Sequence, residues 1–231
     1  MGRKNGMIMA IDGPAGVGKS SVGRAVAQAL GYGFFNTGEM YRSLAWKMEQ
    51  SAISAADSAA VDALARVSSW EFKKAVDGVT IKTVLDGRLM DKELLGESVS
   101  RNSSAIAASP RLREFMTDLQ RKLGADGGIV MEGRDIGTVV FPDAELKIYL
   151  DASPQERARR RFAQLQAAGL KADYQAILDG IIARDGNDAG RKVAPLKKAS
   201  DSQVIDTSFI TIEQVIAKIL ELAKNKCSRI W

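Results

Sequence analysis

The sequence predicts an α/β fold built on a parallel sheet, and two features of its hydrophobic pattern indicate this class. Short apolar runs of strand length alternate with longer segments of helical periodicity, which is the rhythm of consecutive βαβ units. A glycine-rich turn joins the first apolar run to the first helical segment. A chain of 231 residues, 45% of them hydrophobic, can bury one large core. We therefore expect one domain with a small insert rather than two independent domains.

The expected strands are short apolar runs, several of them rich in β-branched residues. The first covers residues 7–11 and leads through the glycine-rich turn into a helix over 20–30, after which a second strand follows at 33–37. Three further strands are expected at 127–132, 145–150 and 202–207. Ser153 and Thr211 each precede a Glu or Gln by three residues, which predicts helix starts at both places.

Residues 70–90 depart from this rhythm, because three β-like runs are separated there by two Asp-Gly pairs. Asp77-Gly78 and Asp86-Gly87 suit tight two-residue turns, whose central residues take positive φ angles. We predict a small antiparallel meander, inserted into the parallel α/β chain.

Composition excludes several kinds of chemistry. The formal net charge of +5 and the pI near 9.3 fit anionic partners, with nucleotides and nucleic acids equally suitable. The only cysteine is Cys227, which favours a reducing compartment, and no apolar run approaches the roughly 20 residues that span a bilayer. We expect a cytoplasmic protein with no membrane partner. The absence of histidine excludes Ser-His-Asp and Cys-His nucleophiles.

Residues 13–20 match the pattern G-x-x-x-x-G-K-[ST] between a strand and a helix, the setting that this pattern requires. Glycines let the backbone wrap closely, so that N–H groups and the helix N-terminus face phosphate oxygens. Lys19 would neutralise the outer phosphates, and the Ser20 hydroxyl would be a ligand of Mg²⁺. We expect the phosphates of a nucleoside triphosphate to be bound by Gly13, Pro14, Ala15, Gly16, Val17, Gly18, Lys19, Ser20 and Ser21.

This loop indicates a nucleoside triphosphate but no particular reaction. A hydrolase needs a positioned water, whereas a kinase needs a second pocket lined with cations for its acceptor. Thr37 and Arg42 lie five residues apart around the start of the next helix, where a hydroxyl and a guanidinium can both face an anion.

The strongest signal comes from four further segments, which read NTGEMYRSLAW, SAIAASPRLRE, EGRDIGTVVFPDAELKIYLDASPQERARRR and ARDGNDAGRKVAPL. With the loop, they closely resemble the cytidylate kinase family of bacterial nucleoside monophosphate kinases, from Met7 into the C-terminal helix. The resemblance implies a five-stranded parallel sheet flanked by helices, an antiparallel β insert and a short lid. Its implied parts are a core at about 1–66, 110–160 and 200–231, the acceptor-binding insert at 67–109 and the lid at 160–192.

The resemblance further implies that the acceptor's phosphate is gripped by Thr37, Arg42, Arg134 and Arg191. Planar guanidiniums suit this task because each can bind two oxygens, whereas an isolated arginine is often only a solvated surface charge. Many relatives have Ser where Thr37 stands, so the hydroxyl donor is kept.

Base selection is attributed by the same resemblance to Ser104, Arg113 and Asp135. Cytosine offers an exocyclic amine beside two acceptors, which match a carboxylate beside hydroxyl and guanidinium donors. Uracil would turn a carbonyl oxygen toward that carboxylate, at a cost of several kcal/mol. The alternative for Asp135 is a turn cap after Gly133-Arg134.

Three further roles have alternatives. In the family, the equivalents of Arg184 and Asp188 bind the ribose, whereas the alternative is an ordinary i,i+4 surface pair. Arg157, at the approach to the lid with Arg160 and Arg161, is implied to supply charge to the transition state, although charge runs are often solvated faces. Glu132 either positions metal-bound water or is structural.

The reaction implied is transfer of the γ-phosphoryl of Mg-ATP to CMP or dCMP, with Lys19, Arg134, Arg191 and Arg157 as the catalytic candidates. Uridylate or adenylate kinase is an alternative within the same class. A nucleic-acid-binding ATPase is an alternative from another class, suggested by the pI and by the RARRR run. We expect ATP and CMP or dCMP as partners, no nucleic acid, and a monomer.

Overall fold

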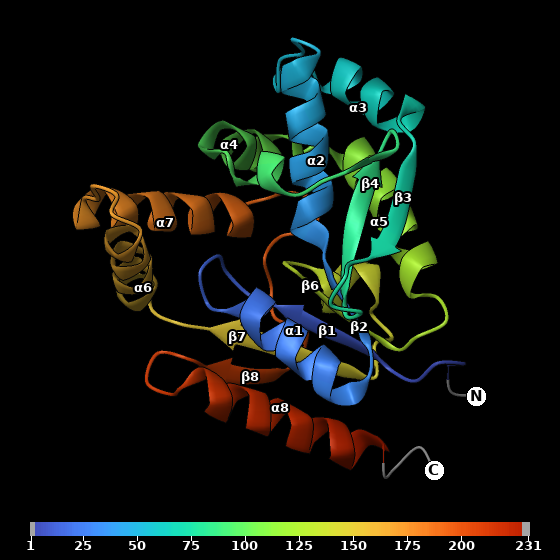
Figure 1. Cartoon of the computed structure of the whole chain (residues 1–231), viewed down its shortest axis with the longest axis vertical. Helices are drawn as coiled ribbons and strands as arrows, with labels where there is room; N and C mark the ends of the chain where they lie inside the picture. Colours follow the sequence, from blue (N-terminus) through green and yellow to red (C-terminus); the bar gives the residue numbers. More distant parts are fainter. Residues whose placement is uncertain (1–2, 228–231) are drawn as a thin grey trace.

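The computed structural model describes residues 3–227, and a mostly parallel sheet with helices on both faces lies at its centre (Figure 1). Residues 1–2 and 228–231, Trp231 among them, lie outside the described range. The strands are β1 (Ile8–Asp12), β2 (Gly33–Asn36), β3 (Trp70–Lys74), β4 (Thr80–Leu85), β5 (Arg88–Leu89), β6 (Ile129–Gly133), β7 (Leu146–Asp151) and β8 (Gln203–Asp206). Their order is β3-β4-β2-β6-β1-β7-β8, and β5 pairs with β4. The five predicted parallel strands are confirmed, as β2-β6-β1-β7-β8, but the sheet continues beyond them through β4, β3 and β5.

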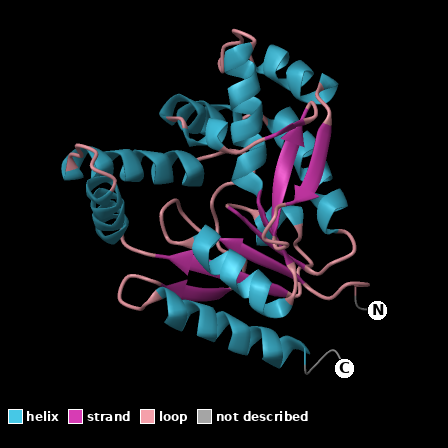
Figure 2. Cartoon of the chain, viewed as in Figure 1, coloured by secondary structure: helices cyan, strands magenta, loops and turns pink. Residues whose placement is uncertain are grey.

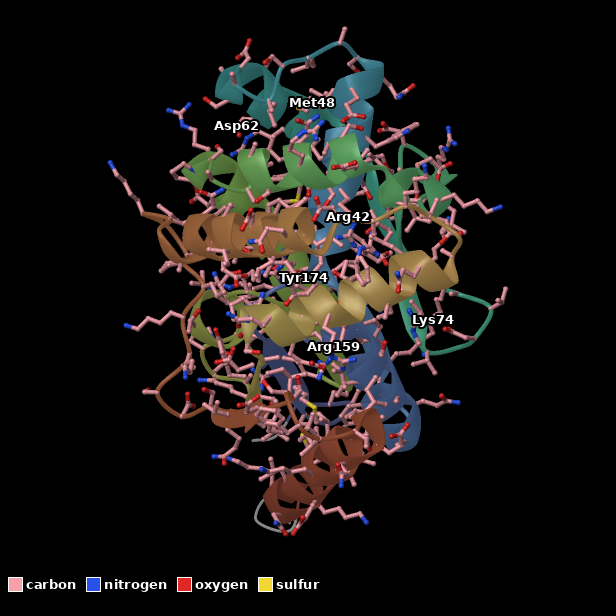
Figure 3. The ribbon with its side chains drawn as sticks, turned by 90° about the vertical axis from the view of Figure 1, so that its left-hand side faces the viewer. Arg42, Met48, Asp62, Lys74, Arg159 and Tyr174 are labelled. Carbon is pink, nitrogen blue, oxygen red and sulfur yellow. The ribbon has the colours of Figure 1, made fainter. Side chains whose placement is uncertain are left out.

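Helices cover both faces of this sheet (Figure 2). They are α1 (Lys19–Leu30), α2 (Thr37–Gln50), α3 (Ser58–Val67), α4 (Glu97–Ile106), α5 (Pro110–Gly124), α6 (Pro154–Ala167), α7 (Tyr174–Ala189) and α8 (Ile212–Cys227). A 3₁₀ turn spans Lys92–Leu95, and a single π-helical turn spans Ile136–Val140. Helices α6 and α7 form a pair that crosses the side of the molecule facing the viewer in Figure 3. Within residues 3–227, none of the helices combines the length and the apolar character that a membrane span requires.

The two predicted helix starts are confirmed by their caps. The Ser153 hydroxyl accepts a hydrogen bond from the Glu156 backbone N–H at 3.2 Å, just before α6. At α8 the capping is reciprocal, because the Thr211 N–H donates to Gln214 Oε1 at 2.8 Å and the Gln214 N–H donates to Thr211 Oγ1 at 3.3 Å. These bonds satisfy N–H groups that have no partner inside the helix.

The antiparallel meander is present, and it also lengthens the central sheet. Asp86 and Gly87 have φ angles of 50° and 79°, as the predicted tight turn between β4 and β5 requires. The first Asp-Gly pair belongs instead to a wider connection, in which the Asp77 carboxylate accepts hydrogen bonds from the backbone N–H groups of Val79 and Thr80. Strand β4 pairs with β2 in parallel, so the insert and the glycine-rich loop are attached to one sheet.

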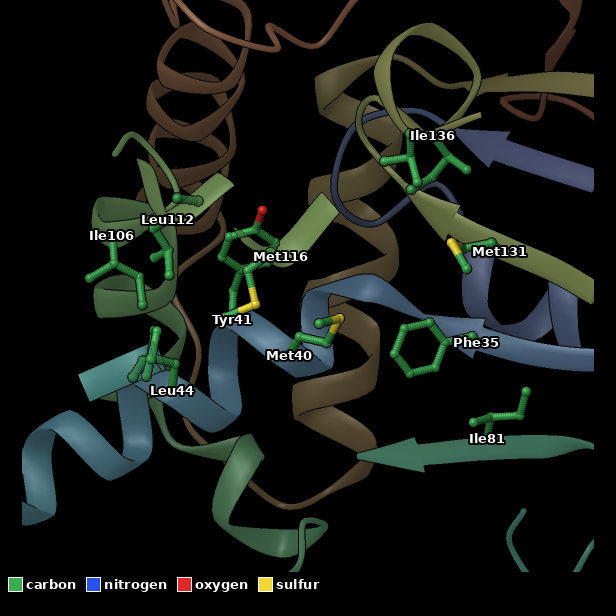
Figure 4. Packing of buried hydrophobic residues seen from close by; sticks show 14 of the residues in the cluster. Phe35, Met40, Tyr41, Leu44, Ile81, Ile106, Leu112, Met116, Met131 and Ile136 are labelled. Atoms are coloured by element: carbon green, nitrogen blue, oxygen red, sulfur yellow. The ribbon is translucent and has the colours of Figure 1, made fainter. Parts of the chain in front are cut away.

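The core consists mainly of two apolar clusters, one on each face of the sheet. Figure 4 shows part of the first, where Phe35 of β2 and Met131 of β6 face Met40 of α2. In the second, Ile11 and Phe34 pack with Val22 of α1. Both clusters hold β1, β2 and β6 side by side. The carboxyl ends of these strands meet at one edge of the sheet, where open α/β sheets bind their ligands.

Candidate active site

The glycine-rich loop connects β1 to α1 and encloses the side chain of Lys19. Gly13 has a φ of 147°, and a Cβ atom there would lie 2.1 Å from the Leu150 carbonyl oxygen, so no other residue fits. Lys19 Nζ donates hydrogen bonds to the carbonyl oxygens of Gly13 at 2.9 Å and Pro14 at 2.6 Å. Burial, together with the positive charge of Arg134, lowers the pKa of Lys19 to about 7. A buried cation of this kind gains stabilisation when anionic oxygens approach it.

Ser20 and Glu132 meet at the base of the loop. Ser20 Oγ donates a 2.6 Å hydrogen bond to Glu132 Oε1, at the carboxyl end of β6. The other oxygen, Glu132 Oε2, is buried and has no hydrogen-bond partner. Hydroxyl and carboxylate oxygens are suitable Mg²⁺ ligands, so these residues fit the ion. Within residues 3–227, no cluster of three or more Asp, Glu, His or Cys could hold a metal, and Mg²⁺ sites commonly combine one or two carboxylates with substrate phosphates.

A cavity of about 360 Å³ opens beside the loop and brings together side chains from distant parts of the chain. Among the residues predicted from the sequence, its walls contain Ala15, Gly16, Gly18, Lys19, Ser20, Ser21, Thr37, Arg42, Ser104, Arg113, Arg134, Asp135, Arg184, Asp188 and Arg191. Figure 3 shows where Arg42 lies, near the level of α6 and α7. Every residue proposed for the acceptor nucleotide is therefore in one cavity that adjoins the loop.

Positive charge dominates this cavity. Burial lowers the pKa values of Arg42, Arg184 and Arg191, and repulsion from Arg134 adds to the effect at each of them. Arg184 Nε is buried without a hydrogen-bond partner. These guanidinium groups repel one another, and a ligand with two negative charges would relieve that repulsion. The cavity is therefore suited to bind a dianion.

Asp188 forms ion pairs with two of these arginines, Arg134 and Arg191. Its side chain is buried, and Oδ2 accepts a 2.8 Å hydrogen bond from Arg134 Nε while Oδ1 accepts one from Arg191 Nη2. Burial alone would raise the pKa of Asp188, but Arg134 and Arg191 outweigh it and the pKa is lowered. Helix α7 does extend through Arg184 and Asp188, yet the alternative of an ordinary surface pair is wrong because Asp188 is only 1% exposed.

Arg113 and Asp135 form a buried ion pair in the wall of the same cavity. Arg113 Nη2 donates to Asp135 Oδ2 at 2.5 Å, and Nη1 donates to the Ala107 carbonyl oxygen at 3.2 Å. Arg113 Nε is buried without a partner. The alternative role of Asp135 as a turn cap is wrong, since its side chain makes no capping bond to the following π-helical turn.

Thr37 and Asp12 anchor the backbone around the cavity. Thr37 Oγ1 donates to the Glu132 carbonyl oxygen at 2.8 Å, which ties α2 to β6. The Asp12 carboxylate accepts hydrogen bonds from the N–H groups of Ile136 at 2.8 Å and Gly137 at 2.7 Å, and burial raises its pKa to about 6. Sequence reasoning missed Asp12, although a carboxylate at the end of an apolar strand beside the loop is a usable signal.

Arg157 contacts the loop but does not line the 360 Å³ cavity. Its Nη1 donates to the Ala15 carbonyl oxygen at 3.1 Å, and Nε donates to the Ala152 carbonyl oxygen at 3.0 Å. With Arg160 and Arg161 it lines a larger cleft of about 1530 Å³, which shares Ala15, Gly16 and Gly18 of the loop with the smaller cavity. Asp185, which sequence reasoning missed, binds both terminal nitrogens of Arg157.

A phosphate-binding loop at the carboxyl end of a parallel sheet, beside a second cavity lined with arginines, is the arrangement of a P-loop phosphotransferase. A family model described as cytidylate kinase matches residues 9–225. This chain belongs to the cytidylate kinase family, and it is therefore a kinase.

Individual relatives match over almost their full length. The cytidylate kinase of Citrifermentans bemidjiense is 41% identical over 227 residues, covering 98% of this chain and 97% of the relative. The cytidylate kinase of Pelotomaculum thermopropionicum is 43% identical over 212 residues, covering 92% and 93%. Among solved structures, a shikimate kinase from Bacteroides thetaiotaomicron matches with a TM-score of 0.48 at 13% identity, covering 94% of this chain and 98% of that one.

Proposed function

We propose that the chain transfers the γ-phosphoryl group of ATP, bound with Mg²⁺, to the 5′-phosphate of CMP or dCMP, giving ADP and CDP or dCDP. The observation that supports this most is that one cavity beside the glycine-rich loop is lined by Arg42, Arg134, Arg184 and Arg191. Two nucleotides that must react both carry negative charge, so a kinase needs cations on the donor and the acceptor side.

The chain's contribution to the reaction is positioning and neutralisation of charge. The acceptor oxygen is already anionic at neutral pH, so neither a strong general base nor a covalent intermediate is required. Lys19 turns from the carbonyls of Gly13 and Pro14 toward the outer phosphates of ATP. Arg134 and Arg191 hold the acceptor's phosphate and stabilise the transferring group, in an orientation set by Asp188.

The metal has a defined place in this proposal. Ser20 and Glu132 would hold Mg²⁺, through the hydroxyl and through the carboxylate oxygen that has no other partner. When bound, Mg²⁺ would neutralise part of the negative charge of the phosphates.

Selection of the acceptor base rests on Asp135, Arg113 and Ser104. The Asp135 carboxylate accepts from the exocyclic amine of cytosine, while Arg113 and Ser104 donate to its ring nitrogen and carbonyl oxygen. Asp188 still has lone pairs for the ribose hydroxyls, because a carboxylate accepts about four hydrogen bonds. Arg184 assists by donating from Nε, which has no other partner.

The remaining roles concern larger parts of the chain. Residues 67–109 form the acceptor-binding insert and 160–192 the lid, which closes over the donor phosphates with Arg157 as a source of positive charge. We also propose that the enzyme acts as a monomer in the cytoplasm, without a nucleic-acid partner. Light scattering tests the monomeric state, and an oligonucleotide titration at physiological salt tests whether nucleic acid binds.

The direct test measures ADP formation from Mg-ATP with CMP, dCMP, UMP, AMP, GMP or no acceptor. The expected result is strong stimulation by CMP and dCMP alone in the wild type, and its loss in Lys19→Met, because the variant cannot neutralise the donor phosphates. Turnover without an acceptor, or a preference for UMP or a purine, contradicts the proposal.

A further inference from the structure

The last two turns of helix α7 contact both sides of the active site. Asp185 faces Arg157 and the glycine-rich loop, and Asp188 faces Arg134 and Arg191 in the acceptor cavity. The two carboxylates are three residues apart, so less than one helical turn separates the two sets of contacts.

On the donor side, Asp185 fixes Arg157 in a bidentate ion pair. Asp185 Oδ1 and Oδ2 accept from Arg157 Nη1 and Nη2 at 3.1 and 2.5 Å, and the Arg157 side chain is 2% exposed. The same guanidinium donates to the Ala15 carbonyl oxygen, and a Cβ atom on Gly16 would lie 3.5 Å from Arg157 Cβ. Because bidentate pairs permit little reorientation, the position of α7 limits the position of the loop.

On the acceptor side, Asp188 is fixed by both its side chain and its backbone. The carboxylate binds Arg134 and Arg191, and the Leu196 N–H donates to the Asp188 carbonyl oxygen at 2.8 Å. A phosphate held by Arg134 and Arg191 therefore restrains the end of α7 as well.

We infer that the Arg157–Asp185 ion pair couples the donor and acceptor sites, so that each nucleotide binds more tightly when the other is present. Either ligand orders the end of α7, and the second ligand then binds without repeating that loss of conformational entropy. The coupling is reciprocal, since both affinities change by the same factor. Asp185 is a positioning residue in this arrangement, because it acts through Arg157. The inference rests on the proposed function, which supplies the identity of the two ligands.

The test is calorimetric titration of CMP with and without saturating Mg²⁺ and a non-hydrolysable ATP analogue. In the wild type the analogue is expected to tighten CMP binding by about 10-fold, within the usual range of allosteric coupling. In Asp185→Asn the factor is expected to fall below about 2-fold, while the affinity for CMP alone is unchanged. Asp179→Asn is the matched control, because Asp179 lies exposed on the same helix, bonded to Gln175, and should keep the wild-type factor.

A second variant, Arg157→Lys, keeps the positive charge but lacks the bidentate geometry, and it should lose the coupling in the same way. It decides the question if Asp185→Asn does not fold, as judged by circular dichroism. Undiminished coupling in a folded variant, or an absence of coupling in the wild type, overturns the inference. If the wild type does not phosphorylate CMP, the proposed function fails instead, so the two failures are distinguishable.

Discussion

The Asp135 carboxylate and the Arg113 guanidinium are paired at 2.5 Å, with side chains only 7% and 6% exposed. Neither group could be buried alone without a large cost in free energy. The ion pair therefore holds the carboxylate in a fixed position inside the cavity. There it can accept a hydrogen bond from the edge of a bound base.

Replacing Asp135 by Asn tests this reading of the base. The variant should lose a charge-assisted acceptor for the cytosine amine and offer an amide group instead, so selectivity for CMP over UMP should fall by about 10- to 100-fold. The measurement is kcat/KM for both acceptors. Asp118→Asn, at an exposed position on the same helix as Arg113, is the control and should keep the preference. An unchanged CMP:UMP ratio in Asp135→Asn would refute the assignment.

We predict that Lys19 makes the affinity for ATP depend on pH. Its pKa is about 7 in the free enzyme because of burial, and approaching phosphates stabilise the ammonium and raise that value. Binding should therefore take up a proton between about pH 7 and pH 10, and ATP affinity should fall as the pH rises through this window. Calorimetry at pH 8 in two buffers of different ionisation enthalpy measures the uptake. Lys19→Met should show none of it, and equal uptake in both proteins would contradict the prediction.

Glu132→Gln tests the proposed metal ligand. The neutral amide can still accept the hydrogen bond from Ser20 but attracts Mg²⁺ less, so kcat should fall by about 10- to 100-fold and half-saturation should need more Mg²⁺. A magnesium titration of the initial rate measures both. Glu114→Gln, exposed on α5, should behave as the wild type. A fall in kcat with no change in the Mg²⁺ requirement would assign Glu132 a structural role only.

Gly13→Ala should distort the glycine-rich loop and also lower the stability of the whole protein. The new methyl group would meet the Leu150 carbonyl oxygen, and the positive φ adds strain, so the free energy of unfolding should fall by about 2–4 kcal/mol. Gly78→Ala is the matched control, since Gly78 has a φ of 68° and no heavy atom within 4 Å, and should cost about 1 kcal/mol. Urea unfolding of both variants measures the difference, and equal losses would show that the contact is easily relieved.

Hydrophobic periodicity was sufficient to place the five parallel strands β1, β2, β6, β7 and β8 along the chain. The strand expected at 145–150 is observed at Leu146–Asp151, and the one at 202–207 at Gln203–Asp206. Local patterns were sufficient here because apolar spacing and helix caps act within a few residues. The parallel pairing of β4 with β2 was not predictable in this way, since it depends on the path of the chain in space.

Some of the site residues could likewise be predicted from the sequence, whereas others could not. Those in the glycine-rich loop follow from a contiguous motif with a physical mechanism, and the acceptor residues follow from a family resemblance. Contacts such as Asp12 with Ile136, or Arg157 with Ala15, join residues more than 120 positions apart. A single sequence contains no signal for such pairs, because burial and distance arise only after folding.

The four arginines that line the proposed acceptor cavity should enable the free enzyme to bind simple dianions. Inorganic phosphate and sulfate carry the charge and the oxygen geometry to which Arg42, Arg134, Arg184 and Arg191 are suited. Such ions would occupy the proposed acceptor site without presenting a base to Asp135. A phosphate or sulfate buffer should then inhibit this kinase competitively, and the apparent affinity for its acceptor should depend on the salt in the assay.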